Sequence, residues 1–135
     1  MEKLANRPEL VLSGVVVTGD RRGGAELGFP TANVELDEDA AELPEDGVYA
    51  GWLEDEGGER RLAAVSVGNR PTYYGERGVR LLEAYVIDFE GDLYGQHVRV
   101  GLAARVRGQE RFSGSAELIA QMRRDVEAVR ALAGG

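Results

Sequence analysis

The stretch "HVRVGLAARVRGQERFSGSAELIAQMRRDVEAVRAL", residues 97–132, changes its hydrophobic period once, and this change indicates the fold class. Its first third alternates apolar and arginine side chains, as in a β-strand with one buried face. After FSGS, apolar residues recur at three- and four-residue steps, which is typical of an amphipathic helix. The inward set of the strand is Val98, Val100, Leu102, Ala104 and Val106, and the helical stripe is Leu118, Ile119, Met122, Val126 and Val129.

The ends of this helix also carry signals. Ser113 or Ser115 can accept hydrogen bonds from the first free backbone N–H groups and so cap the start. Glu117 lies in the first turn, where a carboxylate interacts favourably with the helix dipole. We expect the helix to end at Gly134.

The rest of the chain predicts further short strands, because its apolar runs are brief and bounded by turn residues, including many of its 19 glycines. A hairpin turn is expected around Gly57 and Gly58, and residues 90–95 should connect the last two strands. The expected strands are 11–18, 31–36, 48–53, 62–67, 81–89 and 97–106. Six strands and one helix in a single domain of 135 residues favour a mostly β fold, a closed or nearly closed antiparallel barrel with the helix packed on it. A sandwich fits the pattern nearly as well.

The composition excludes several kinds of site. The chain has no cysteine, one histidine (His97) and one lysine (Lys3). Disulfides, thiolate zinc sites and cysteine nucleophiles are therefore ruled out, and so are the phosphate-binding lysines of P-loop proteins and protein kinases. Phosphate chemistry in this chain must use backbone amides, arginine and a metal ion. His97 lies in a strand-like run, and a structural role is its simpler interpretation.

The net charge of −8 disfavours a nucleic-acid partner, because such proteins normally carry a basic surplus. No apolar run approaches the ~20 residues of a membrane helix, and the N-terminal residues do not resemble a signal peptide. We expect a cytoplasmic monomer that acts on small molecules, with no membrane partner.

The segment GDRRGGAELGFPTAN, residues 19–33, is the first candidate site. Its glycines allow the backbone to fold around an anion with N–H groups pointing inward. If a strand follows, Thr31 and Asn33 share one face, and their oxygen atoms suit Mg²⁺ held largely by substrate phosphates. The alternative is a surface loop leading into a strand with a polar outer face.

Glu83 is the second candidate, since it stands in a row with the large residues Leu81, Tyr85 and Ile87. Such a carboxylate either discourages aggregation at a sheet edge or is held in a cleft for proton transfer. The third candidate is RVRGQERF, residues 105–112, where an arginine or Phe112 could flank a planar ring, although arginines there are more often simply solvated.

Together these segments resemble riboflavin kinases. GDRRGGAELGFPTANV, DGVYAGWL, VSVGNRPTYYG, LLEAYVIDFEGDLYG and RVRGQERFSGSAELIAQMRRDV occur in the order seen in that family. The resemblance is to the kinase module of bacterial bifunctional riboflavin kinase/FAD synthetases and runs from about residue 6 to 132. The GGAEL sequence in the glycine-rich segment resembles actinobacterial members of the family. It implies a six-stranded antiparallel Greek-key barrel with a C-terminal helix, and a reaction in which ATP and riboflavin give FMN and ADP with Mg²⁺.

The resemblance also implies roles for individual residues. Glu83 would be the catalytic base, and Thr31 and Asn33 would hold the magnesium ion. The residues implied for ATP and phosphate binding are Gly19, Arg22, Gly23, Gly24, Gly28, Pro30, Thr31 and Asn33, and those for flavin binding are Val106, Arg107, Glu110 and Phe112.

Two departures from the family pattern are expected to matter. Nothing in this chain corresponds to the adenylyltransferase domain of the bifunctional relatives, so we expect it to make FMN and to stop there. Tyr85 stands where the family often has a histidine, which could alter the fit of the flavin. Two alternatives stay open: a non-catalytic flavin- or nucleotide-binding module of the same fold, and a kinase for another ribityl-bearing or nucleoside-like compound.

Overall fold

The computed structural model describes residues 10–17, 31–37, 44–68, 81–89, 91–110 and 112–134. These residues form six strands and one helix, in agreement with the elements predicted above. Their bounds are β1 Leu10–Val17, β2 Ala32–Leu36, β3 Gly47–Glu54, β4 Arg60–Val67, β5 Leu81–Val86, β6 His97–Arg107 and α2 Ser115–Leu132. The fifth strand is shorter than predicted, because Asp88 adopts a left-handed backbone conformation (φ 59°) that an extended strand does not allow.

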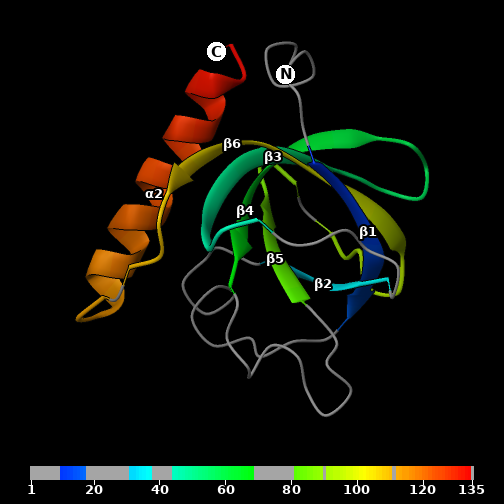
Figure 1. The fold of residues 1–135 in the computed structure, drawn as a ribbon, viewed down its shortest axis with the longest axis horizontal. Coiled ribbons are helices and arrows are strands. Elements are labelled where there is room, and N and C mark those ends of the chain that lie inside the picture. The colour runs from blue at the N-terminus through cyan, green and yellow to red at the C-terminus, as the bar shows by residue number, and fades with distance from the viewer. Residues whose placement is uncertain are drawn as a thin grey trace.

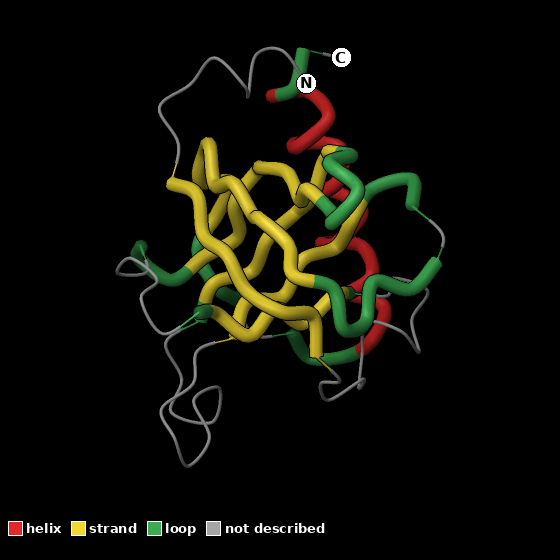
Figure 2. Tube along the Cα trace, turned by 90° about the vertical axis from the view of Figure 1, so that its right-hand side faces the viewer, coloured by secondary structure: helices red, strands yellow, loops and turns green. Residues whose placement is uncertain are grey.

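The strands close into a barrel in the order β1-β2-β5-β4-β3-β6, with β6 pairing back onto β1 (Figure 1). Every pair is antiparallel. Strands β3 to β5 follow one another as neighbours, and β6 returns to lie beside β3, which is the Greek-key arrangement. Figure 2 shows the strands wrapping around a common interior, so the barrel is confirmed and the sandwich is wrong.

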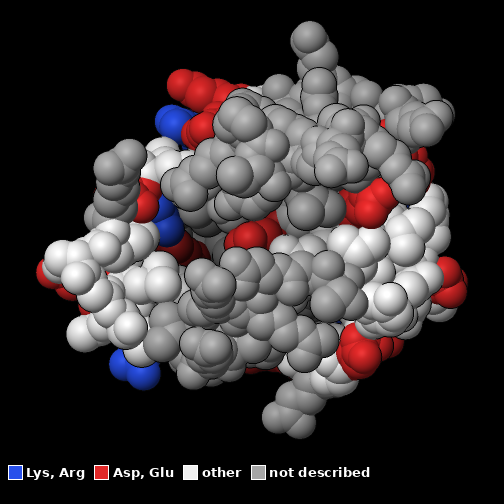
Figure 3. Space-filling view, turned by 90° about the horizontal axis from the view of Figure 1, so that it is seen from below, with Lys and Arg blue, Asp and Glu red and all other residues white. Residues whose placement is uncertain are grey.

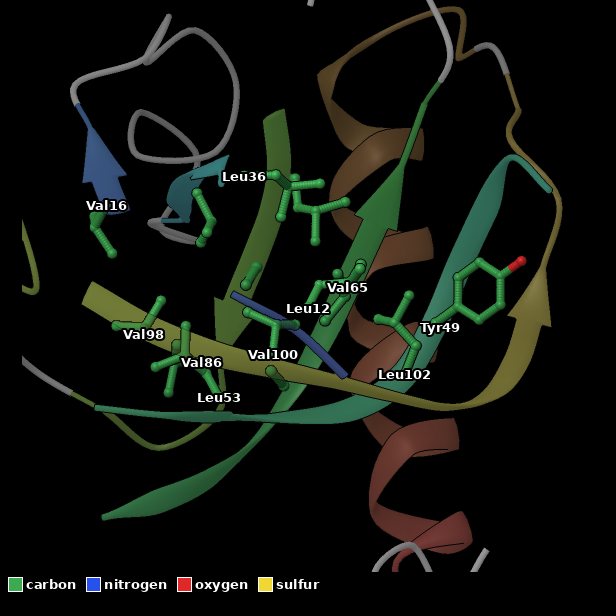
Figure 4. Close-up of a cluster of buried hydrophobic side chains, with 14 of the residues drawn as sticks. Leu12, Val16, Leu36, Tyr49, Leu53, Val65, Val86, Val98, Val100 and Leu102 are labelled. Atoms are coloured by element: carbon green, nitrogen blue, oxygen red, sulfur yellow. The ribbon is translucent and has the colours of Figure 1, made fainter. Parts of the chain in front are cut away.

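The barrel interior is filled by aliphatic side chains and one tyrosine from all six strands, as Figure 4 shows. In β2, the buried Val34 and Leu36 belong to this cluster, and Ala32 packs against it. Because successive side chains of a strand point to opposite faces, Asn33 lies on the outer face. This confirms the face that was predicted for Asn33.

Strand β6 departs from the predicted alternation near its end. Val98, Val100 and Leu102 lie in the barrel interior, but Val106 packs in the cluster between the barrel and α2. The register of β6 against β3 shifts twice, so that residues 103 and 106 are extra relative to the partner strand. A β-bulge changes the face of the residues that follow it, so the shift after Leu102 turns Ala104 and Val106 outward. Their predicted inward positions are therefore wrong.

Helix α2 lies against one side of the barrel and contacts β3, β4 and β6 (Figure 1). Val129 and Ala133 are buried there against Ala50 and Ile87. Gly134 has φ 98° and follows the C-cap residue, which confirms the predicted end.

The predicted cap at the start of α2 is wrong. The N-cap is Gly114, and no side chain caps the helix there. Instead, the Glu117 carboxylate in the first turn reaches back and accepts a hydrogen bond from the Ser113 backbone N–H at 3.3 Å. A side chain inside the helix thus pairs with a backbone group of the segment that precedes it.

One glycine is required by close packing on the outer face of the barrel. Trp52 is only 1% exposed, and its ring lies over Gly101 of the neighbouring strand. A Cβ atom on Gly101 would lie 2.2 Å from the Trp52 ring. The Arg60 guanidinium covers the ring from outside, 3.7 Å from its centroid. Glycine is the residue that admits a tryptophan so close to the backbone.

Candidate active site

Three polar residues form a row across neighbouring strands on the outer face of the barrel. Glu83 of β5 lies directly opposite Asn33 of β2 on one side and Ser66 of β4 on the other. Side chains at such directly paired positions have Cβ atoms about 4.5–5.5 Å apart. We refer to Asn33, Glu83 and Ser66 as the polar row.

The polar row borders the apolar cluster beneath α2. Leu82 and Ala84 point into the barrel, so Glu83 points outward beside Tyr85, which packs against that cluster. Asn33 is only 9% exposed, whereas Glu83 and Ser66 are half-buried. The hydrogen-bond ladders on both sides of β5 fix the backbone that carries this carboxylate, whose surroundings are partly apolar. The sheet-edge interpretation of Glu83 is wrong, because β5 is paired on both sides in a closed barrel.

Gln109 reaches this row from the segment after β6. Its Nε2 atom donates hydrogen bonds to the Ser66 Oγ atom at 2.9 Å and to the Val67 carbonyl oxygen at 3.0 Å. Residues 108–110 thus leave the barrel beside the strand that flanks Glu83. The predicted flavin segment and the predicted catalytic residue are therefore brought together.

Arg107 anchors the other side of the same segment to α2. Its Nε and Nη2 atoms donate to the two carboxylate oxygens of Asp125 at 2.8 and 2.9 Å, and its Nη1 atom donates to the Gly108 carbonyl oxygen at 2.9 Å. Asp125 is only 4% exposed and also accepts a hydrogen bond from the Gln121 side chain at 2.9 Å. A planar guanidinium suits this paired geometry, because it presents two parallel N–H groups to one carboxylate.

The other residues predicted for the site are placed as follows. Thr31 is half-buried and directly precedes β2, so it lies next to the polar row. Glu110 is exposed, and the Phe112 ring lies 5.8 Å from the Arg107 guanidinium carbon. Gly19, Arg22, Gly23, Gly24, Gly28 and Pro30 lie outside the described residues. His97 lies elsewhere, at the start of β6, and its Nε2 atom is 2.9 Å from the Asp37 carboxylate.

Sequence reasoning missed Ser66, Gln109 and Asp125. Ser66 stands in a strand whose outward neighbours are apolar, and a lone serine there gives no functional signal. Gln109 lies among three arginines, and the arginines were the residues considered for contact with a planar ring. Asp125 is a polar residue next to the apolar stripe of the helix, and this position is the one signal that was available for it.

On the face seen in Figure 3, acidic side chains of the described residues are more widespread than basic ones, in keeping with the net charge of −8. Among the described residues, no helix is long and apolar enough to cross a membrane.

Comparison with known proteins agrees with this architecture. Residues 7–133 match the family model Flavokinase, which describes riboflavin kinase. The bifunctional riboflavin kinase/FMN adenylyltransferase of Escherichia coli K12 is 43% identical over 126 residues, or 92% of this chain. The chain spans 38% of the length of that relative.

Two solved structures share the fold. The riboflavin kinase from Trypanosoma brucei matches with a TM-score of 0.66 and 26% identity, over 94% of this chain and 81% of that one. A Streptococcus pneumoniae structure named as a macrolide-efflux protein matches with a TM-score of 0.77 and 34% identity, over 89% of this chain and 38% of that one. The family match extends over nearly the whole chain, and a closed Greek-key barrel with one C-terminal helix accompanies it. The chain therefore belongs to the riboflavin kinase family.

Proposed function

We propose that this chain transfers the γ-phosphoryl group of ATP to the terminal ribityl hydroxyl of riboflavin, giving FMN and ADP, with Glu83 as general base. Family membership supports the substrates. The observation that supports the site is the position of Glu83 between Asn33 and Ser66, on a strand paired on both sides. The backbone ladder fixes where this carboxylate points, which a base needs in order to meet one particular hydroxyl.

The proposed reaction is an in-line displacement. The riboflavin hydroxyl oxygen forms a bond to the γ-phosphorus of ATP, the bond from that phosphorus to the β,γ-bridging oxygen breaks, and ADP leaves. The hydroxyl proton passes to the Glu83 carboxylate. Phosphoryl transfer depends mostly on positioning and on neutralising the charge of the phosphate oxygens, so a single oriented carboxylate is sufficient as the base.

The residues next to Glu83 fit a magnesium ion. Mg²⁺ prefers oxygen ligands, keeps several water molecules, and is commonly held by one or two protein groups together with substrate phosphates. Asn33 offers a carboxamide oxygen directly opposite Glu83, and Thr31 offers a hydroxyl two residues earlier. When bound there, the ion would neutralise charge on the phosphate oxygens. We propose that residues 19–28 cover the nucleotide with backbone N–H groups.

We place the isoalloxazine ring of riboflavin against the segment from Val106 to Phe112. Within this segment, Arg107 is bonded to α2 and Gln109 to the polar row. A planar ring in this position would lie near the Phe112 side chain while its ribityl tail extends towards Glu83. Glu110, which is exposed, would contact the flavin from the solvent side.

The proposed activity is tested by titrating the purified chain with riboflavin and then adding MgATP. We expect riboflavin binding followed by the appearance of FMN on chromatography, without FAD. Binding without FMN would instead indicate a non-catalytic flavin-binding module. Turnover of ATP with another ribityl-bearing or nucleoside-like acceptor, but not with riboflavin, would show that the acceptor is wrong.

A further inference from the structure

Gln109 connects two parts of the barrel that are far apart in the sequence. It follows the end of β6, yet its side-chain amide hydrogen-bonds to Ser66 and Val67 at the end of β4. The same Nε2 atom is 3.5 Å from the Gly47 carbonyl oxygen at the start of β3. One side chain thus ties the segment after β6 to the ends of two other strands.

These contacts place Gln109 next to the candidate base. Ser66 Oγ accepts from Gln109, and Ser66 is directly paired with Glu83 across the β4–β5 ladder. Gln109 therefore holds the residue that stands one strand away from Glu83, since adjacent strands lie roughly 4.8 Å apart.

Arg107 restrains the same segment from the opposite side. Its paired hydrogen bonds to the buried Asp125 hold the end of β6 against α2. With Arg107 tied to the helix and Gln109 tied to β4, the two residues on either side of Gly108 are held in place. If the Gln109 contact is lost, residues 108–110 lose their hydrogen bonds to β4 and keep the hydrogen bond from Arg107 to the Gly108 carbonyl oxygen.

We propose that Gln109 is a positioning residue for the acceptor substrate. It holds residues 108–110 against the end of β4, the strand next to Glu83, so that the flavin and its ribityl hydroxyl are presented to the base. This inference rests on the proposed function. It locates the role of Gln109 on the riboflavin side of the reaction, whereas Asn33 and Thr31 serve the nucleotide side.

The test compares Gln109→Ala with Gln96→Ala. Gln96→Ala is the same chemical change in the segment before β6, where the Gln96 side-chain oxygen accepts a hydrogen bond from the Glu56 backbone N–H. For Gln109→Ala we expect the KM for riboflavin to rise roughly 10-fold, the effect of losing one or two ordinary hydrogen bonds, with the KM for MgATP unchanged. Gln96→Ala should resemble the wild type in both constants.

Two further variants separate positioning from general loss of stability. Gln109→Glu keeps the side-chain length but cannot donate to the Val67 carbonyl oxygen, so its riboflavin KM should rise at least as much as that of Gln109→Ala. Ser66→Ala removes one of the acceptors of Gln109. If the two residues act through this contact, Gln109→Ala should raise the riboflavin KM less in the Ser66→Ala background than in the wild type. Thermal unfolding of each variant shows whether the chain stays folded at the assay temperature.

The outcomes are distinguishable. If the wild type makes FMN and Gln109→Ala matches Gln96→Ala in riboflavin KM, the inference is overturned and the proposed function stands. Equal rises in both KM values would also overturn it, because they would indicate general disorder of the site. If the wild type makes no FMN, the proposed function fails and the inference fails with it.

Discussion

Asn33 and Glu83 are directly opposite each other in the β2–β5 ladder, with both side chains on the outer face of the barrel. This pairing places a carboxamide and a carboxylate within a few ångströms of each other on strands separated by more than forty residues of sequence. The proposed division of labour follows from it. Asn33 serves the metal and phosphates, and Glu83 serves the acceptor hydroxyl.

Replacing Asn33 by alanine should impair the use of MgATP much more than the binding of riboflavin. A hydrogen bond or ligand to a charged group typically contributes ~1.5–3 kcal/mol, so we expect the KM for MgATP to rise by about 10-fold or more. Thr31→Ala should act in the same direction. Steady-state kinetics at limiting Mg²⁺ measure the effect, and Glu35→Ala, two residues along the same face of β2, is the control. Full activity of Asn33→Ala at limiting Mg²⁺ would show that this face does not bind the nucleotide.

The Arg107–Asp125 pair should contribute strongly to stability. Both side chains are largely buried, and Asp125→Ala leaves the guanidinium without its carboxylate partner. Breaking such a pair typically costs about 3–5 kcal/mol of unfolding free energy, which urea denaturation can measure. Asp88→Asn, which removes the charge of the exposed pair with Arg130 and tolerates the left-handed backbone at this position, should cost much less. Replacing both Arg107 and Asp125 by apolar residues should restore most of the loss; a double variant as unstable as Asp125→Ala would contradict this explanation.

Gly101→Ala should destabilise the barrel through overpacking. The new methyl group would have to displace the Trp52 ring, which is buried and also covered by Arg60. Overpacking of this kind costs about 1–3 kcal/mol. Gly57→Ala is the control, because its added carbon would meet only the end of the Asp55 side chain, at 3.3 Å. Similar midpoints of thermal unfolding for both variants would contradict the close packing of Trp52 on Gly101.

Acid should weaken the fold partly through Asp88. Hydrogen bonds from Arg130 lower the pKa of the Asp88 carboxyl below its ordinary value. A carboxyl with a lowered folded-state pKa stabilises the fold above its unfolded-state pKa, and this contribution is lost as the pH falls through the folded-state pKa. The Asp88→Asn variant keeps a residue that tolerates the left-handed backbone but removes the charge. The difference in unfolding free energy between wild type and variant should be constant above about pH 5 and shrink below it. A difference that does not change with pH would contradict a role for the charge.

Much of the fold was predictable because periodicity reports which face of an element is buried. Val98, Val100 and Leu102 alternate in the sequence and lie in the barrel interior as predicted. The alternation fails at Val106 because the two bulges of β6 arise from its pairing with β3, and the sequence of β6 alone carries no sign of that register. The cap of α2 was predicted wrongly for a different reason. The serines on either side of Gly114 are both residue types that commonly cap helices, but the N-cap position is Gly114.

The site was predictable only in part. Residue chemistry and the family resemblance singled out Asn33 and Glu83, and the structure pairs them. Gln109 and Ser66 could not be found in this way, because their contact depends on which strand ends meet in the closed barrel. Neither residue type is unusual in its local sequence, and the register of the barrel alone makes them neighbours of Glu83.

The most direct test of the central claim is the rate of FMN formation from riboflavin and MgATP by the wild type and by Glu83→Gln, measured side by side. Glutamine keeps the shape of the side chain but cannot accept the hydroxyl proton, and general base catalysis contributes typically ~10²–10⁴ in rate. We predict FMN formation by the wild type and a kcat at least about 100-fold lower for Glu83→Gln, with riboflavin and MgATP still bound. A variant that retains more than about a tenth of the wild-type kcat would contradict the assignment of Glu83 as the base.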